Sequence, residues 1–211
     1  MLLVLLATLV LINLHMLGAS RLGSLIRNVG LQAIIISVMA ILVIPGERLW
    51  HFWVITGLSI LVKGVLLPKL MKYALRESNT RREVEPYVSY PVSILLGLFF
   101  LGSCLWISHI LPLESISIPP LALGISLFTI CVGLFLIVSR SKAITQTIGY
   151  LSMENGIYAT GLILSFSQSF IVEMGVLLDV FVGVFVMGIL VFHINREFDH
   201  IDIHLLSNLK D

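Results

Sequence analysis

Three ionisable side chains lie inside long apolar stretches of this sequence and are the residues best placed to do chemistry: Glu154, Asp179 and Lys63. A charged side chain at the centre of a bilayer costs about 2.5–3.5 kcal/mol on insertion scales, so it usually marks an ion pathway, a proton relay or a buried ion pair. Two carboxyl groups and one amine at that depth predict a site that handles protons.

Glu154 is surrounded by polar residues at helical spacing. Residues four apart share a helix face, so Gln146, Tyr150 and Tyr158 are expected to line up with it. Asn155 follows directly in the chain. The polar line predicts a carboxyl group that carries a proton inside the membrane. The alternative interpretation is a protonated carboxyl that hydrogen-bonds to a neighbouring helix.

Asp179 and Lys63 are each expected to face other helices rather than lipid. Gly175 and Gly183 flank Asp179 at four-residue spacing, and small residues let a second helix approach closely. Asp179 would then relay protons or pair with a cation. Lys63 would either change its charge state or act as the counter-ion of Glu154, of Asp179 or of a residue in a partner subunit. Its central position disfavours a side chain that reaches back to the membrane surface.

The elements that position these residues follow from composition. The chain has 211 residues, of which 58% are hydrophobic and 12% charged, whereas soluble domains are about 45–50% apolar and about 25% charged. About 20 apolar residues span a bilayer as a helix. The fold is therefore predicted to be all-α, a polytopic transmembrane bundle of about seven helices. The expected spans are residues 1–19, 28–45, 50–71, 90–111, 119–138, 143–165 and 171–193.

The basic residues predict how this bundle is oriented. Loops rich in Lys and Arg stay in the cytoplasm. Seven helices place ten basic residues on one side: Arg21, Arg27, Lys72, Arg76, Arg81, Arg82, Arg140, Lys142, Arg196 and Lys210. Only Arg48 falls on the other side, so the N-terminus is expected outside and the C-terminus inside. No basic residue precedes the first apolar stretch, which favours a retained helix over a signal peptide.

Three segments are expected along the chain. Residues 1–114 would form a four-helix membrane segment, and residues 115–195 would form a three-helix segment. Residues 196–211 would form an amphipathic cytoplasmic tail that lies on the membrane or against a partner.

Several other functions are disfavoured by the sequence. A net charge of +1 argues against a nucleic-acid partner. Cys104 and Cys131 lie in apolar runs and predict buried thiols, and His200 and His204 lack a third metal ligand. No nucleophile or phosphate-binding motif occurs. We therefore expect no catalytic residue, no cofactor and no metal in this chain.

The segment around Glu154 also has a family resemblance. Residues 148–156 read IGYLSMENG, Asp179 lies within LLDVF, Lys63 precedes an LLP turn, and the chain ends in DIHLLSNLKD. These features resemble component E of the membrane-bound hydrogenase-4 family, in which a Gly-Tyr-x-x-Met-Glu-Asn-Gly run is typical. The resemblance covers nearly the whole chain and is strongest after Arg140.

The last three expected helices are also similar to a more distant pair of small subunits, the K subunit of respiratory complex I and the C subunit of multi-subunit cation/proton antiporters. In this small-subunit family, the protein has three helices, with its N-terminus outside and its C-terminus inside, and one carboxylate in each of the last two helices. Glu154 and Asp179 match those positions. The first four helices have no counterpart, so the resemblance implies nothing about Lys63.

The resemblance implies a non-catalytic, proton-conducting subunit in the bacterial inner membrane. Its partners would be other membrane subunits of a hydrogenase or an antiporter-like complex, which would hold the redox centres. Glu154 and Asp179 would carry protons, and Lys63 would modulate their charge. The alternative is a structural or assembly subunit of an antiporter-like complex, in which the buried charges hold subunits together. A freestanding transporter is disfavoured because no paired inverted repeat is visible.

Overall fold

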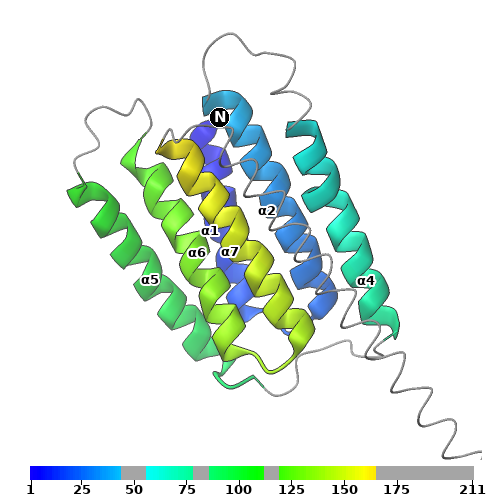
Figure 1. The fold of residues 1–211 in the computed structure, drawn as a ribbon. Helices are drawn as coiled ribbons and strands as arrows, with labels where there is room; N and C mark the ends of the chain where they lie inside the picture. Colours follow the sequence, from blue (N-terminus) through cyan, green and yellow to red (C-terminus); the bar gives the residue numbers. More distant parts are fainter. Residues whose placement is uncertain (44–55, 78–85, 112–118, 165–211) are drawn as a thin grey trace, which may run out of the picture.

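A computed structural model describes residues 1–43, 56–77, 86–111 and 119–164, and this part of the chain is all-α as predicted (Figure 1). It contains six α-helices and one π-helical segment: α1 (Leu2–Gly18), α2 (Leu22–Val43), η1 (Ile60–Leu66), α4 (Leu67–Glu77), α5 (Tyr90–Ile110), α6 (Pro120–Ser139) and α7 (Ala143–Ile163). The expected span at 171–193, with Asp179, and the expected tail at 196–211 lie outside the described residues.

Two helices extend beyond the apolar stretches that predicted them. The helix α2 begins at Leu22, six residues before the expected start at 28, and α4 ends at Glu77 rather than at 71. Residues 21–27 are therefore mostly helical, not a connecting loop. Arg27 and Arg76 interrupt the apolar runs, but both side chains are exposed on the outer faces of their helices. A cation on an outer face ends a hydrophobic run without ending the helix.

Apolar side chains cover the outside of the bundle. On α5, Leu95 is 66% exposed, and Phe99 and Trp106 are each 68% exposed. Within the described residues, three helices are long and apolar enough to cross a membrane, Leu22–Leu42, Tyr90–Ile110 and Pro120–Ser139, and α1 is a shorter apolar helix. Lipid is the solvent in which such an outer face is stable. The chain is a multi-pass membrane protein.

Consecutive helices of the bundle run in alternating directions. The chain passes from α1 to α2, from α4 to α5 and from α6 to α7 at the same end (Figure 1). Arg21, Arg76, Arg140 and Lys142 lie at or next to those helix ends. These four basic residues therefore gather at one end of the bundle.

The helices α6 and α7 pack so closely that their backbones touch (Figure 1). A Cβ added to Gly149 would lie 2.8 Å from the carbonyl oxygen of Gly133 and 2.9 Å from the amide nitrogen of Ile137. A Cβ on Gly156 would lie 2.7 Å from the amide nitrogen of Ile130. Only glycine permits this approach, as is common where helices associate in membranes. The contact determines which face of α7 points away from α6.

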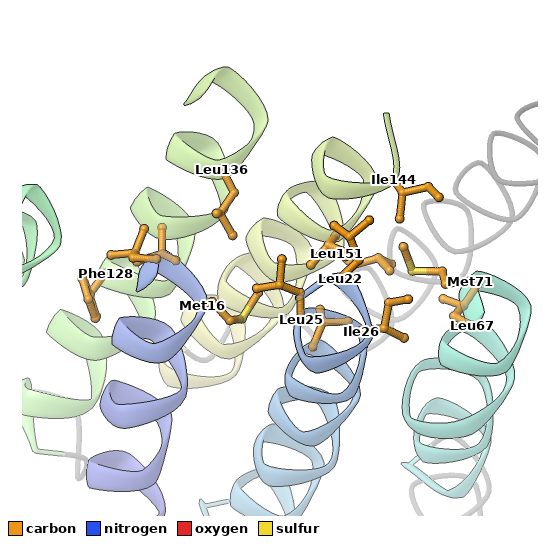
Figure 2. Packing of buried hydrophobic residues seen from close by; sticks show 14 of the residues in the cluster. Met16, Leu22, Leu25, Ile26, Leu67, Met71, Phe128, Leu136, Ile144 and Leu151 are labelled. Atoms are coloured by element: carbon orange, nitrogen blue, oxygen red, sulfur yellow. The ribbon is translucent and has the colours of Figure 1, made fainter. Parts of the chain in front are cut away.

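An apolar cluster joins the helices α2, α4 and α7 near the end where α2 begins (Figure 2). Its members include Leu22, Leu25, Ile26, Leu67, Met71, Ile144 and Leu151. Inside a bilayer the hydrophobic effect does not favour helix association, so van der Waals packing carries the stabilisation. The cluster holds α4 in one orientation against α2 and α7.

Arg140, counted above only as a loop charge, is a buried capping residue. It is 1% exposed, and its Nη2 donates to the carbonyl oxygen of Leu17 at 2.8 Å. Nη1 donates to the carbonyl oxygen of Val88 at 3.0 Å, and the guanidinium lies 4.7 Å from the centre of the Tyr90 ring. A helix leaves its last carbonyls without backbone partners, and Arg140 satisfies one of them on α1. One side chain therefore ties together the ends of α1, α5 and α6.

Candidate functional site

A π-helical turn places Lys63 in the middle of the third helix. Residues 56–77 are helical throughout, with η1 from Ile60 to Leu66. Pro68 has no N–H, and its ring would crowd the carbonyl four residues earlier in an α-helix. The N–H of Leu67 donates to Val62, five residues back, which is the π-helical pattern. The extra residue in the turn lets the helix continue past the proline, and such turns are frequent at functional sites.

Two glycines let this turn approach α2 closely. A Cβ on Gly30 would lie 3.0 Å from Cγ of Pro68 and 3.2 Å from the carbonyl oxygen of Gly64. A Cβ on Gly64 would lie 2.9 Å from Cγ1 of Ile34. The segment η1 therefore lies directly against α2, within reach of α7 on the other side.

The central feature of the site is a buried ion pair between Lys63 and Glu154. The ammonium group Nζ of Lys63 donates to Oε1 of Glu154 across the seam between η1 and α7. The two side chains are 9% and 4% exposed. Of the partners that the sequence left open for Lys63, the structure shows Glu154, and Asp179 lies outside the described residues. Removing one partner of a buried ion pair typically costs about 3–5 kcal/mol of stability, because the remaining charge is left buried without compensation.

Two tyrosines flank the carboxylate one turn away on either side. Tyr150 and Tyr158 are both partly buried on α7. The ammonium of Lys63 lies 5.8 Å from the centre of the Tyr158 ring, within the range of a cation–π interaction. Gln146 donates its amide to the carbonyl oxygen of Arg140 at 3.1 Å, so this member of the predicted polar line closes the connection between α6 and α7.

Asn155 connects the site to α2. Its Nδ2 donates to the carbonyl oxygen of Val29 at 3.2 Å, and the residue is 5% exposed. Adjacent residues on a helix point about 100° apart, so Glu154 faces η1 while Asn155 faces α2. The hydrogen bond determines how α7 is rotated and thereby where the carboxylate points.

A second buried polar network escaped the sequence interpretation. Nε2 of Gln32 donates to Oδ1 of Asn13 at 2.6 Å, and Nδ2 of Asn13 donates to Oγ1 of Thr129 at 2.8 Å. These residues of α2, α1 and α6 are 0%, 0% and 1% exposed. The three residues come from three different apolar stretches, so no spacing rule links them. The available signal was a side chain with an amide or hydroxyl group inside each of three predicted spans.

Metal ligands are sparse in the described part of the chain. Within residues 1–43, 56–77, 86–111 and 119–164, no group of three or more His, Cys, Asp or Glu residues could hold a metal ion. The thiols of Cys104 and Cys131 face each other across α5 and α6 with 3.8 Å between the sulfur atoms. His200 and His204 lie outside the described residues.

The fold and the site define a multi-pass membrane protein with an ion pair buried inside its helix bundle. The chain is 31% identical over 161 residues to the uncharacterized protein Rv0085 of Mycobacterium tuberculosis, which is 74% of this chain and 71% of that protein. It is 27% identical over 152 residues to hydrogenase-4 component E of Escherichia coli and of Shigella flexneri, 72% of this chain and 70% of those proteins.

The chain belongs to the family of these proteins, and the resemblance to hydrogenase-4 component E that the motifs indicated is confirmed. No family model matches the sequence. No solved structure matches it either.

Proposed function

We propose that this chain is a non-catalytic subunit of a hydrogenase-4-like complex in the bacterial inner membrane, and that the Lys63–Glu154 pair takes part in proton translocation. Homology to hydrogenase-4 component E supports a subunit of such a complex. The single observation that supports the proton role is the buried ion pair between η1 and α7. Ionisable groups at this depth are expensive and commonly belong to proton relays.

The pair can act as a charge switch. When Glu154 is ionised, it neutralises the ammonium of Lys63. When a proton binds the carboxylate, that attraction is lost, and the ammonium becomes available to the next anionic group. Two unit charges about 4 Å apart interact with about 4 kcal/mol at an effective dielectric constant of about 20. A charge change in a neighbouring subunit that alters the electrostatic energy at Glu154 by a similar amount would therefore move the proton on or off this carboxylate.

The other predicted relay residues have supporting roles in this proposal. Asp179 would be the next proton carrier along the membrane. Tyr150 and Tyr158 would line the approach to Glu154, and Asn155 would hold α7 in the productive rotation. The orientation would be N-terminus out and C-terminus in, because the basic residues at one end of the bundle belong in the cytoplasm.

The test replaces Glu154 by Gln in the assembled complex. The amide keeps the size of the side chain but cannot carry the proton. We expect a loss of proton translocation by the complex that assembles, measured with a pH-sensitive dye in inverted membrane vesicles and normalised to the amount of intact complex. Proton translocation at the wild-type rate in an intact complex would rule out the relay role.

A purely structural role is the second candidate, favoured by the geometry of the same pair. A buried ion pair between two helices can hold a bundle together without moving protons. The exchanged double variant K63E/E154K distinguishes the two roles. If the double variant recovers both the assembly and the proton movement that the single variants K63E and E154K lose, the position of the carboxylate does not matter and the pair acts mainly in packing. If it restores assembly alone, the position of the carboxylate matters for the relay.

A further inference from the structure

One face of α4 carries three cations that nothing in the proposed function uses. Lys69, Lys72 and Arg76 recur at the spacing of one helix face, and all three side chains are exposed. Tyr73 lies among them and is 54% exposed. The face is defined here as the basic face of α4.

The opposite face of α4 is locked into the bundle. Leu67 is 3% exposed and Met71 is 2% exposed, and both belong to the cluster shared with α2 and α7 (Figure 2). Pro68 lies against Gly30 of α2. The helix cannot roll about its axis without breaking these contacts, so the basic face is directed outward.

The depth of this face in the membrane follows from the ion pair. Glu154 is the twelfth of the 21 residues of α7, so its partner Lys63 lies near the middle of the bundle. With a helical rise of 1.5 Å per residue, Lys69, Lys72 and Arg76 lie about 9, about 14 and about 20 Å further along the helix axis. The hydrocarbon half-thickness is about 15 Å, and a lysine stem covers the shortfall at Lys69. The three cations therefore reach the layer of the lipid phosphates.

We propose that the basic face of α4 binds the phosphate groups of acidic phospholipids. Juxtamembrane clusters of Lys and Arg attract anionic lipid, and ammonium and guanidinium groups form charge-assisted hydrogen bonds to phosphate. Tyr73 supplies an amphipathic ring at the depth where tyrosine is enriched in membrane proteins. The part of the chain that the structure describes contains two acidic residues, Glu77, which follows Arg76 in the sequence, and Glu154, which is paired with Lys63. The site does not depend on any proton role of Glu154.

The experiment uses the purified full-length chain in a zwitterionic detergent. Phosphatidylglycerol or phosphatidylcholine is titrated in, and bound lipid is counted by native mass spectrometry. We expect phosphatidylglycerol to bind preferentially and the preference to fall with added salt. The variant K69Q/K72Q/R76Q should lose affinity by roughly fivefold for each cation removed.

A charge-matched control separates a site from net charge. The variant R21Q/R27Q/K142Q removes the same number of cations from other elements at the same end of the bundle and should bind nearly as well as the wild type. The variant K69R/K72R/R76K changes the same three positions but conserves their charges, and it should also keep binding. Its binding would show that substitution at these positions does not by itself unfold the protein. Equal loss in both neutralised variants, or no preference for phosphatidylglycerol in the wild type, would overturn the proposal. Lipid binding by K69Q/K72Q/R76Q at the wild-type level would also overturn it.

Discussion

The ammonium group of Lys63 pairs with the carboxylate of Glu154 although 91 positions separate the two residues in the chain. Lys63 lies in the π-helical turn of η1, which packs closely against Gly30 of α2. Glu154 lies on α7, which packs closely against Gly133 of α6. The ion pair therefore depends on several distant features of the bundle at once. Each of these features can be tested separately.

Removing one partner of the ion pair should destabilise the protein more than removing both. Lys63→Met leaves a buried carboxyl without its cation, and we expect a loss of about 3–5 kcal/mol in the free energy of unfolding. The double variant K63M/E154M replaces both charges by apolar groups and should lie close to the wild type. Unfolding by a denaturing detergent, followed by circular dichroism, gives the values. Additive losses in the double variant would show that the two side chains do not interact.

Adding a methyl group at Gly149 should separate α6 from α7. The new Cβ would lie 2.8 Å from the carbonyl oxygen of Gly133 and 2.9 Å from the amide nitrogen of Ile137, both of which are backbone atoms. We expect Gly149→Ala to cost about 1–3 kcal/mol through overpacking. The control is Gly102→Ala on α5, where a Cβ meets nothing within 4 Å among the described residues. Equal stability of the two variants would contradict the close helix contact.

The neutral polar network should contribute measurably to stability. Asn13→Leu removes the acceptor for Gln32 and the donor to Thr129, so two buried polar groups lose a partner. Each such loss costs about 1–3 kcal/mol. Ser103→Ala is the control, because the Ser103 hydroxyl only bonds back to the carbonyl oxygen of Phe99 on the exposed side of α5. A thermal unfolding midpoint unchanged by Asn13→Leu would argue against the network.

Arg140 should not tolerate replacement by lysine. The guanidinium donates in two directions, to the carbonyl oxygens of Leu17 and of Val88, and a single ammonium cannot reproduce that planar fork. We expect Arg140→Lys to lose about 1.5–3 kcal/mol for each charged hydrogen bond that is broken. The measurement is the rate of limited proteolysis at the end of the bundle where α6 ends, which should be higher in the lysine variant than in the wild type. Wild-type resistance of the lysine variant would mean that charge alone suffices there.

The expected orientation can be tested with topology reporters. A reporter that is active only in the cytoplasm should be active when fused after Asp211, because the basic residues at one end of the bundle favour that side. A reporter that requires the periplasm should be inactive at the same position. The reverse pattern would refute the assignment of N-terminus out and C-terminus in.

Helix positions were largely predictable from the sequence, whereas contacts between helices were not. The expected spans at 90–111, 119–138 and 143–165 agree with α5, α6 and α7 to within two residues, because apolar length is a local property. Residues 21–27 were misassigned as a loop, because Arg27 interrupts the apolar run while the helix continues. Arg140 was interpreted as a loop charge because its carbonyl partners come from segments far away in the chain.

The amino-acid sequence by itself determined that this chain is a helical membrane protein, which helices it forms in most of its length, and which ionisable residues stand out in them. These conclusions follow from local hydrophobicity, which acts without reference to the rest of the chain. Only the tertiary structure decided that Lys63 pairs with Glu154 and that Asn13, Gln32 and Thr129 form one network. Both depend on how each helix is rotated about its axis, which is set by contacts between helices such as those at Gly30 and Gly64 for the π-helical segment and at Gly149 and Gly156 for α7.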